Sequence, residues 1–357
     1  MNIVFRVDSS YSIGTGHVMR CLTLAKELKK NSNIQFICRN RSGNLINKIE
    51  SEGYKVLQLN SKEPRHKISL SKKIDWLGTS QEQEILDSKK VLKEIKPDWL
   101  IVDHYGIGSH WHEEMYKFSK KLLVIDDLAN RHYNCDLLLD QNYYEDTFSR
   151  YKNLVQSKCK LLLGPKYALL RKEFSIKSPS WRNIDINRIL VYFGGLDIKD
   201  NILKTLKGIE GCKRNNINVD VIVGQNSLFN EEIINLSSNI KNIKIYDFVD
   251  NIGEMMRNSD LYIGSAGTTT WERSCAGLPS IVISVAENQV EPMKELKKAG
   301  ISFFLGSHEK VNSQDILKQL NKIIDNPSVL EKMRQKNLDL VDGYGVSRCV
   351  SEILVNS

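Results

Sequence analysis

The sequence lacks the patterns that mark disulfide-rich, zinc-ribbon and membrane-spanning proteins. Its seven cysteines lie far apart and form no C-x-x-C pair, so neither a disulfide framework nor a zinc ribbon is indicated. No apolar run approaches the ~20 residues that a membrane-spanning helix needs. The chain opens on a strand-like run without a signal-peptide pattern. We therefore expect a cytoplasmic protein without stable membrane insertion, and we favour a monomer.

Charge is not concentrated in any one segment. Lysine and arginine outnumber aspartate and glutamate by 51 to 43, a net charge of +8, yet no block of five like charges and no nucleic-acid motif occurs. Scattered lysines are typical of a solvated surface, so we expect no nucleic-acid partner. The 357 residues are 41% hydrophobic and 26% charged, which is ordinary for a globular protein. This length favours two domains.

Signatures of nucleotide cofactors and metals are also missing. In the turn Gly14-Thr15-Gly16-His17-Val18-Met19, a methionine stands where a dinucleotide fingerprint requires a third glycine. Arg39 stands where that fingerprint requires an acid. A Walker A loop, an H-E-x-x-H motif and a D-x-D triplet are absent, and His110-Trp111-His112 has no third ligand nearby, so we interpret it as surface. We predict no cofactor and no metal.

What the sequence does contain is a repeated alternation of short apolar runs and helical patterns. Continuous apolar runs alternating with helices are typical of parallel sheets with helices on both faces. The expected strands in the first half are residues 3–7, 34–38, 99–102, 122–125, 137–139 and 161–163. Those in the second half are residues 188–193, 219–223, 243–246, 261–263 and 280–285. Expected helices include residues 45–52, 83–95, 200–208, 267–276 and 292–299.

Two such series predict an α/β protein of two Rossmann-like, doubly wound domains with a cleft between them. We place the N-terminal domain at 1–175, a linker without periodicity at 176–187, and the second domain at 188–342. The remaining residues, 343–357, form a helix that is expected to pack back on the N-terminal domain. Residues 61–79 are polar and lysine-rich, and we interpret them as a surface excursion.

The first candidate site is the opening strand–glycine–helix unit, because such sheets bind ligands beyond the carboxyl ends of their strands. His17 stands at the helix entrance, where it either packs the helix start or acts as a base that the helix dipole keeps neutral. Asp8 either orients this ring or caps the turn. Asp103-His104-Tyr105-Gly106 follows another strand, and there Asp103 either caps a turn or belongs to the site.

The second half offers turns suited to phosphate groups. Gly194-Gly195 follows a strand and supplies backbone N–H groups. Gly264 to Thr270, which includes Thr268, opens a helix with glycine and hydroxyl residues. Glu272 lies one turn into that helix, where it either binds both ribose hydroxyls or complements the helix dipole. Three glycine turns at strand ends are together more specific than any one of them.

Several of these segments resemble a known family. The stretches 6–10, 13–21 and 103–106 closely resemble the UDP-sugar hydrolases of pseudaminic acid biosynthesis, which remove UDP from UDP-2,4-diacetamido-2,4,6-trideoxy-β-L-altropyranose. Spore-coat polysaccharide biosynthesis proteins are related to them. The second half is similar to the transferase that adds N-acetylglucosamine during peptidoglycan synthesis, through Phe248-Val249, Ser265 to Glu272 and Ala276 to Pro279. Trp271 departs from the asparagine of some members.

The resemblance implies a GT-B architecture with UDP held mainly by the second domain. It implies that His17 is the catalytic base and that Tyr105, in the turn of residues 103–106, lies near the sugar. In the opening turn, Gly14 and Gly16 are expected to let substrate approach the backbone closely. The implied contacts in the second domain are Phe248 and Val249 with uracil, Glu272 with ribose, and Asn288 and Gln289 with the sugar or β-phosphate.

The expected chemistry is inverting hydrolysis of a UDP-sugar. Neutral His17 takes a proton from water as the water attacks the anomeric carbon. Inverting glycoside hydrolysis normally also needs an acid, but UDP leaves as a stable anion and makes a proton donor dispensable. Amides at Gly194, Gly195 and Thr268 are expected to stabilise charge on the β-phosphate. The alternatives are a GT-B glycosyltransferase that uses a UDP-N-acetylated sugar, and a UDP-sugar-binding regulator without activity.

Overall fold

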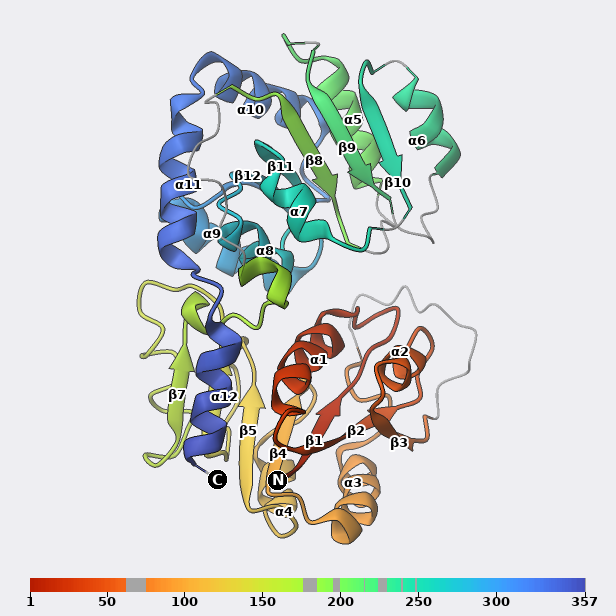
Figure 1. The fold of residues 1–357 in the computed structure, drawn as a ribbon, viewed down its shortest axis with the longest axis vertical. Coiled ribbons are helices and arrows are strands. Elements are labelled where there is room, and N and C mark those ends of the chain that lie inside the picture. The colour runs from red at the N-terminus through yellow and green to blue at the C-terminus, as the bar shows by residue number, and fades with distance from the viewer. Residues whose placement is uncertain are drawn as a thin grey trace. The chain divides into compact units, whose positions relative to one another are not determined.

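The computed structural model describes residues 1–61, 75–175, 185–194, 200–214, 216–223, 230–238, 240–247 and 249–356. The chain divides into two compact units (Figure 1). Unit 1 comprises Met1–Leu170 and Tyr344–Ser357, and unit 2 comprises Arg171–Gly343. Each unit is built on one sheet in which all the strand pairs run parallel. The prediction of two parallel-sheet, Rossmann-like domains is therefore confirmed.

The sheet of unit 1 has the strand order β3-β2-β1-β4-β5-β6-β7, with β1 and β4 next to each other at its centre. Its strands are β1 (Asn2–Val7), β2 (Asn33–Arg39), β3 (Lys55–Leu59), β4 (Trp99–Asp103), β5 (Lys121–Ile125), β6 (Leu137–Asp140) and β7 (Lys160–Leu163). Its helices are α1 (Gly16–Leu28), α2 (Ile46–Ser51), α3 (Gln81–Ile95), α4 (Ser109–Met115) and α12 (Gly345–Val355).

Alternating residues of the central strands supply two cores, one on each face of this sheet. Ile3, Phe5 and Val7 of β1 pack into one core, whereas Val4 packs into the other. Helix α1 and the C-terminal helix α12 cover the first face, since both contribute buried side chains to that core. Helices α3 and α4 cover the second face. The two-residue period of β1 thus explains why helices are needed on both sides.

Unit 2 repeats the scheme with the strand order β10-β9-β8-β11-β12-β13. Its strands are β8 (Arg188–Tyr192), β9 (Asn218–Ile222), β10 (Ile243–Tyr246), β11 (Leu261–Ser265), β12 (Ser280–Ser284) and β13 (Phe303–Ser307). Its helices are α5 (Asn201–Glu210), α6 (Asn230–Ser237), α7 (Ile252–Arg257), α8 (Thr269–Cys275), α9 (Val290–Lys298), α10 (Ser313–Asp325) and α11 (Ser328–Leu340). Strands β8 and β11 lie at its centre and are adjacent.

Every strand expected from the sequence occurs, within two residues at either end, but the expectations for residues 61–79 and 171–175 need revision. Residues 62–74 lie outside the described residues, whereas Leu77 is buried and is not part of a polar surface. Arg171 to Ser175 belongs to unit 2, where the buried Phe174 accepts a hydrogen bond from Cys275 through its carbonyl oxygen. Of the expected linker, residues 176–184 lie outside the described part of the chain.

Candidate active site

Register brings the two N-terminal motifs to one edge of the sheet in unit 1. Strands β1 and β4 pair in parallel with Val7 opposite Asp103. The turn that follows β1 and the turn that follows β4 therefore leave the sheet at the same edge, which is the ligand-binding edge of doubly wound sheets. Helix α1 begins at Gly16, so His17 lies in its first turn directly above this edge.

A carboxylate and a guanidinium hold the His17 ring. Nδ1 of His17 lies 2.6 Å from Oδ1 of Asp103. Arg20, one helical turn further along α1, donates from Nε to Oδ2 of Asp103 at 2.6 Å and from Nη2 to Oδ1 at 2.7 Å. Nη2 of Arg20 also lies 3.2 Å from Nδ1, but the contact with Asp103 is shorter and an ionised carboxylate only accepts hydrogen bonds, so we assign the hydrogen to Nδ1. The opposite ring nitrogen, Nε2, is then left as an acceptor.

Asp103 is fully ionised in this arrangement. Burial by itself would raise the pKa of the Asp103 carboxyl, but the charges and hydrogen bonds of Arg20 and His17 hold that pKa well below its usual value. The Asp103 side chain has no exposed surface, and that of His17 is 10% exposed. The result is a fixed ring with one nitrogen locked on a buried anion, an arrangement suited to accepting a proton.

Aromatic side chains surround the ring. The Tyr105 ring packs edge-to-face on His17 with centroids 4.6 Å apart, and Trp76 packs on Tyr105 at 4.8 Å. The hydroxyl of Tyr105 donates to Asp127. Burial and the charge of Asp127 raise the pKa of Tyr105 well above its usual value, so the phenol remains protonated. Trp76 was missed by the sequence reasoning because it follows a long polar stretch without periodicity.

Asp103, and not Asp8, orients His17. Asp8 is buried and accepts from Nη1 and Nη2 of Arg6 at 2.5 and 2.9 Å, from the backbone N–H of Arg39 at 2.7 Å, and from Nε2 of His104 at 3.1 Å. Its carboxylate therefore ties β1 to β2 and to the turn after β4. The ring-orienting role considered for Asp8 is wrong, because Asp8 is bonded to Arg6, Arg39 and His104, whereas Asp103 is bonded to the imidazole of His17.

Gly14 of the opening turn has open space beside its backbone. Gly14 has a φ of +83°, a conformation that favours glycine, and a Cβ placed on it would meet no atom within 4 Å. Its N–H donates to the carbonyl oxygen of Ser10 at 2.8 Å and closes the turn. Gly16 starts helix α1, whose N-cap residue Thr15 makes no side-chain capping bond. The first backbone N–H groups of α1 thus donate no hydrogen bond to that side chain.

In unit 2, the predicted phosphate turns follow two adjacent strands. Gly194 comes after β8 with a φ of +100°, and a Cβ on it would meet nothing within 4 Å. Thr268 is the N-cap residue of α8, which follows β11. Since β8 and β11 are paired in parallel, both turns lie at the same sheet edge. Gly195 lies outside the described residues.

Two further predicted residues lie around the start of α8. Glu272 forms an ion pair with Arg171 at 3.3 Å, and burial raises the pKa of its carboxyl. The side-chain amide of Gln289 donates to the carbonyl oxygen of Ala266 at 3.2 Å, and its Oε1 accepts from the N–H of Val285 at 2.9 Å. Gln289 thus holds the α8 turn against the end of β12. Asn288 is exposed.

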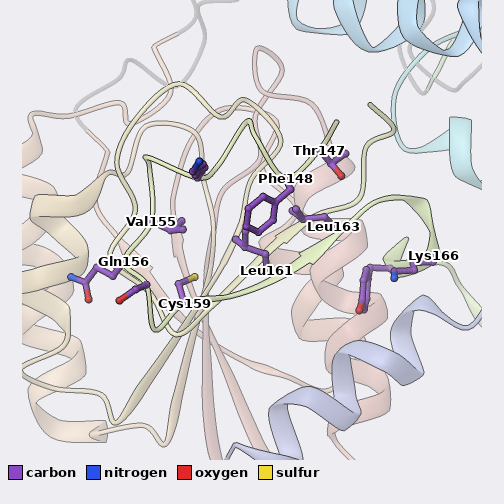
Figure 2. Close-up of a pocket in the computed structure, with 11 residues that line it drawn as sticks. Thr147, Phe148, Val155, Gln156, Cys159, Leu161, Leu163 and Lys166 are labelled. Atoms are coloured by element: carbon purple, nitrogen blue, oxygen red, sulfur yellow. The ribbon is translucent and has the colours of Figure 1, made fainter. Parts of the chain in front are cut away.

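Of the two predicted uracil contacts, the structure describes only Val249. Phe248 lies outside the described residues. Val249 lines a hollow of about 680 Å³ together with Arg188, Asp220 and Tyr246, and neither Gly194 nor Glu272 is among its lining residues. A second hollow, of about 610 Å³, lies beside β7 and is lined by residues that include Phe148, Leu161 and Leu163 (Figure 2). It contains none of the predicted site residues.

The interpretation of His110-Trp111-His112 as surface is wrong for two of its three residues. Trp111 and His112 are buried in unit 1, and Nδ1 of His112 accepts from the N–H of Asn134 at 3.3 Å. Neighbouring residues of a helix point to different sides, and this helix is too short for its buried positions to show a helical period in the sequence. Within the described ranges, no three His, Cys, Asp or Glu side chains converge as a metal-ligand set. No described helix is long and apolar enough to cross a membrane.

Comparison with known proteins places this geometry in context. Residues 189–343 match the glycosyltransferase family 28 C-terminal domain. The chain is 30% identical over 302 residues to an uncharacterized protein of Methanocaldococcus jannaschii, spanning 82% of this chain but only 57% of that relative. It is 24% identical over 354 residues to the spore coat polysaccharide biosynthesis protein SpsG of Bacillus subtilis, covering 98% of this chain and 96% of that one.

Solved structures share the fold across the whole length. MurG of Acinetobacter baumannii superposes with a TM-score of 0.72 at 15% identity, covering 99% of each chain, which shows a GT-B fold. The chain is also 30% identical over 305 residues to the UDP-2,4-diacetamido-2,4,6-trideoxy-β-L-altropyranose hydrolase of Campylobacter jejuni, covering 84% of this chain and 97% of that relative. The chain therefore belongs to the family of this UDP-sugar hydrolase, within the wider group of GT-B enzymes that act on UDP-sugars.

Proposed function

We propose that this chain hydrolyses a UDP-linked 2,4-diacetamido-2,4,6-trideoxy sugar to UDP and the free sugar, as a step of pseudaminic (nonulosonic) acid biosynthesis. The family supports a UDP-sugar enzyme, and the hydrolase of Campylobacter jejuni suggests the substrate. One observation carries the assignment of His17 as the base, whereas the choice of water over another acceptor rests on the hydrolase of Campylobacter jejuni. The Nδ1 hydrogen of His17 is held by the ionised Asp103, so Nε2 is ready to take a proton from water.

In the proposed reaction, the oxygen of water attacks the anomeric carbon from the side opposite to UDP. The bond between that carbon and the phosphate oxygen breaks, its electron pair leaves with UDP, and the configuration inverts. His17 receives the proton of the attacking water on Nε2. The resulting imidazolium is stabilised by Asp103, whose second oxygen is held by Arg20 at 2.6 Å. No acid is required, because UDP departs as a stable anion.

The remaining predicted residues complete the proposal. Tyr105 and the open turn at Gly14 and Gly16 receive the sugar. In unit 2, amides at Gly194, Gly195 and Thr268 receive the β-phosphate. Glu272 binds the ribose, Phe248 and Val249 meet the uracil, and Asn288 and Gln289 lie near the sugar or β-phosphate.

The test is hydrolysis of the UDP-diacetamido sugar in oxygen-18 water, followed by NMR and mass spectrometry. We expect the label on the sugar and not on UDP, inverted anomeric configuration, and no need for an acceptor. His17→Asn should abolish turnover while UDP still binds. His110→Asn, which changes an exposed histidine in the same unit, is the matched control and should retain the rate. A His17→Asn enzyme with near wild-type rate overturns the proposal.

A glycosyltransferase is the second candidate function, favoured by the family 28 match over residues 189–343. It would pass the sugar to an acceptor hydroxyl instead of to water, and His17 would deprotonate that hydroxyl. Incubation without an acceptor separates the two. Stoichiometric release of UDP and free sugar supports the hydrolase, whereas release that requires an added acceptor supports the transferase.

A further inference from the structure

We infer that Trp76 is a specificity-determining residue: with Tyr105 it forms an apolar wall beside His17 that receives a methyl group of the sugar. The methyl belongs either to an acetamido group or to C6 of the 6-deoxy sugar. This inference rests on the proposed function, because it assumes that the sugar of a UDP-sugar lies at His17. It assigns a role to a residue that neither the motifs nor the family resemblance singled out.

Trp76 is held in place by its backbone. The guanidinium of Arg41, a buried residue, donates to the carbonyl oxygens of Trp76 and Asp75, each at 2.7 Å. The N–H of Gly78 donates to Oδ1 of Asp75 at 3.0 Å and closes a turn around Trp76. Hydrogen bonds from a charged donor are stronger than neutral ones, so Trp76 sits on an anchored backbone.

The same segment lies directly on the turn that carries Tyr105. A Cβ placed on Gly106 would lie 2.8 Å from Cγ of Leu77 and 3.0 Å from Cβ of Trp76, so only glycine fits there without displacing this segment. The side-chain amide of Gln81, at the start of α3, donates to the carbonyl oxygen of Gly106 at 2.6 Å. The Trp76 segment and the Tyr105 turn are therefore fixed relative to each other.

The three rings meet at the candidate base. The Trp76 and Tyr105 rings pack edge-to-face at 4.8 Å and 72°, and the Trp76 and His17 rings lie 6.0 Å apart at 74°. His17 and Tyr105 each expose no more than 9% of their surface, whereas Trp76 is half-buried. Trp76 is thus the most exposed of these three residues.

Aromatic surface next to a catalytic base selects apolar substituents. A methyl group packed against an indole gains dispersion and loses contact with water, whereas a hydroxyl there would lose its hydrogen bonds to water without replacement. Pockets of this kind typically discriminate by about 10- to 200-fold for one methyl-sized change. A 2,4-diacetamido-2,4,6-trideoxy sugar carries three methyl groups, one on each acetamido group and one at C5, that are suited to such a wall.

The experiment measures binding by calorimetry on a His17→Asn background, so that no turnover interferes. The probes are the UDP-2,4-diacetamido-2,4,6-trideoxy sugar, its 6-hydroxy analogue, and analogues with formamido in place of either acetamido group. We expect wild-type Trp76 to favour the parent sugar by about 10-fold or more over one of these analogues. Which analogue is disfavoured identifies the methyl that the wall receives.

Substitution then tests the wall itself. Trp76→Gln should reduce that preference to near 1, and Trp76→Phe should preserve most of it, because a ring remains. Phe148→Ala is the matched control: this exposed aromatic residue lies in the same unit beside β7, and its loss should leave the preference unchanged. Far-ultraviolet circular dichroism and UDP binding verify that each variant is folded.

A preference that persists in Trp76→Gln, or an equal weakening for all four sugars, overturns the inference. Absence of any difference among the sugars with Trp76 present overturns it as well. The proposed function is tested independently of this inference. If the enzyme with His17 intact releases no free sugar while the binding preference still depends on Trp76, the hydrolase assignment is wrong but the role of Trp76 in binding is supported.

Discussion

At the scale of single residues, the pair of His17 and Asp103 decides what the site can do. Asp103→Asn removes the anion that accepts the Nδ1 hydrogen and offers an amide that can donate to Nδ1 instead, which would place the hydrogen on Nε2. We expect kcat to fall by roughly 10²- to 10⁴-fold, as for loss of the orienting aspartate in serine proteases. Affinity for UDP should be preserved, as measured by calorimetry.

The matched control for this prediction is Asp98→Asn. Asp98 precedes the same strand, β4, but its contacts are with Lys120 and the backbone of Asn2. Its replacement should leave kcat within about 2-fold, since exposed ion pairs contribute little. A normal kcat in Asp103→Asn would show that Asp103 serves only to stabilise the fold.

His112 makes the stability of the protein sensitive to acid. Burial, with a smaller effect of the Arg131 charge, lowers the pKa of His112 from 6.5 to about 3. Between these two pKa values the unfolded chain binds a proton at this histidine and the folded chain does not. The free energy of unfolding is therefore unaffected by this group above pH 6.5 and falls as the pH drops below 6.5. One proton corresponds to about 1.4 kcal/mol per pH unit.

His112→Gln removes this titration. We expect the free energy of unfolding, measured with urea between pH 6.5 and 4, to fall less steeply with decreasing pH in His112→Gln, by up to the slope of one proton. His110→Gln serves as the control, because His110 lies on the same helix, α4, but is exposed. Equal slopes for wild type and His112→Gln would refute the assignment.

The residues of the site differ in how well sequence predicts them. His17 and Tyr105 stand in motifs at strand ends, and the structure brings both to one edge. Asp8 and Asp103 both follow buried strands and look alike in sequence. Only the register of β1 against β4 and the phase of α1 decide that Asp103 meets the ring, and neither is visible in composition or spacing.

At the scale of elements, the pairing of β8 with β11 leaves no room for a side chain at Gly264. A Cβ on Gly264 would lie 1.9 Å from the carbonyl oxygen of Tyr192 and 2.5 Å from the hydroxyl oxygen of Tyr262. That hydroxyl donates to the Tyr192 carbonyl at 2.6 Å, so neither atom is free to move. Gly264→Ala should therefore destabilise unit 2 by on the order of 3 kcal/mol.

Scanning calorimetry checks this prediction as a lower melting temperature. Gly108→Ala is the control, because a Cβ there would come no closer than 3.8 Å to the side chain of Arg131, an ordinary contact. It should change the melting temperature by little. An unchanged melting temperature in Gly264→Ala would mean that β8 and β11 can separate without cost.

Helices and strands could be predicted from the sequence where their buried residues form a continuous run or a clear period. The central strands are mostly apolar and could be predicted from the sequence, as could the long helices with a clear period. Strand β3 was missed because it is an edge strand with exposed and half-buried positions and so lacks an apolar run. Helix α4 was missed because it has only seven residues. Trp76 belongs to no helix or strand, so its place beside His17 follows from tertiary contacts alone.

At the scale of the whole molecule, the last helix is part of the first unit. Ile353 of α12 has no exposed surface and belongs to the core that also contains Leu24 and Ile3. Ile353→Ala should destabilise unit 1 by about 2–5 kcal/mol through the cavity that it leaves. We expect a lower denaturation midpoint for unit 1, which can be measured from the NMR signals of its methyl groups.

The neighbouring residue provides the control. Leu354 is 39% exposed, so Leu354→Ala should change the midpoint much less. If both variants unfold alike, or if the signals of unit 2 respond to Ile353→Ala first, α12 does not support unit 1 in the way that its burial indicates.

Helix α12 also constrains the order in which the chain can fold during synthesis. Unit 2 is continuous in sequence, whereas the core of unit 1 lacks Cys349 and Ile353 until the ribosome has made them. Domains generally fold as their residues emerge, beginning at the N-terminus. Here the unit that is translated first is completed last, so α1, the helix that carries His17, gains its contacts with α12 only after unit 2 has been translated.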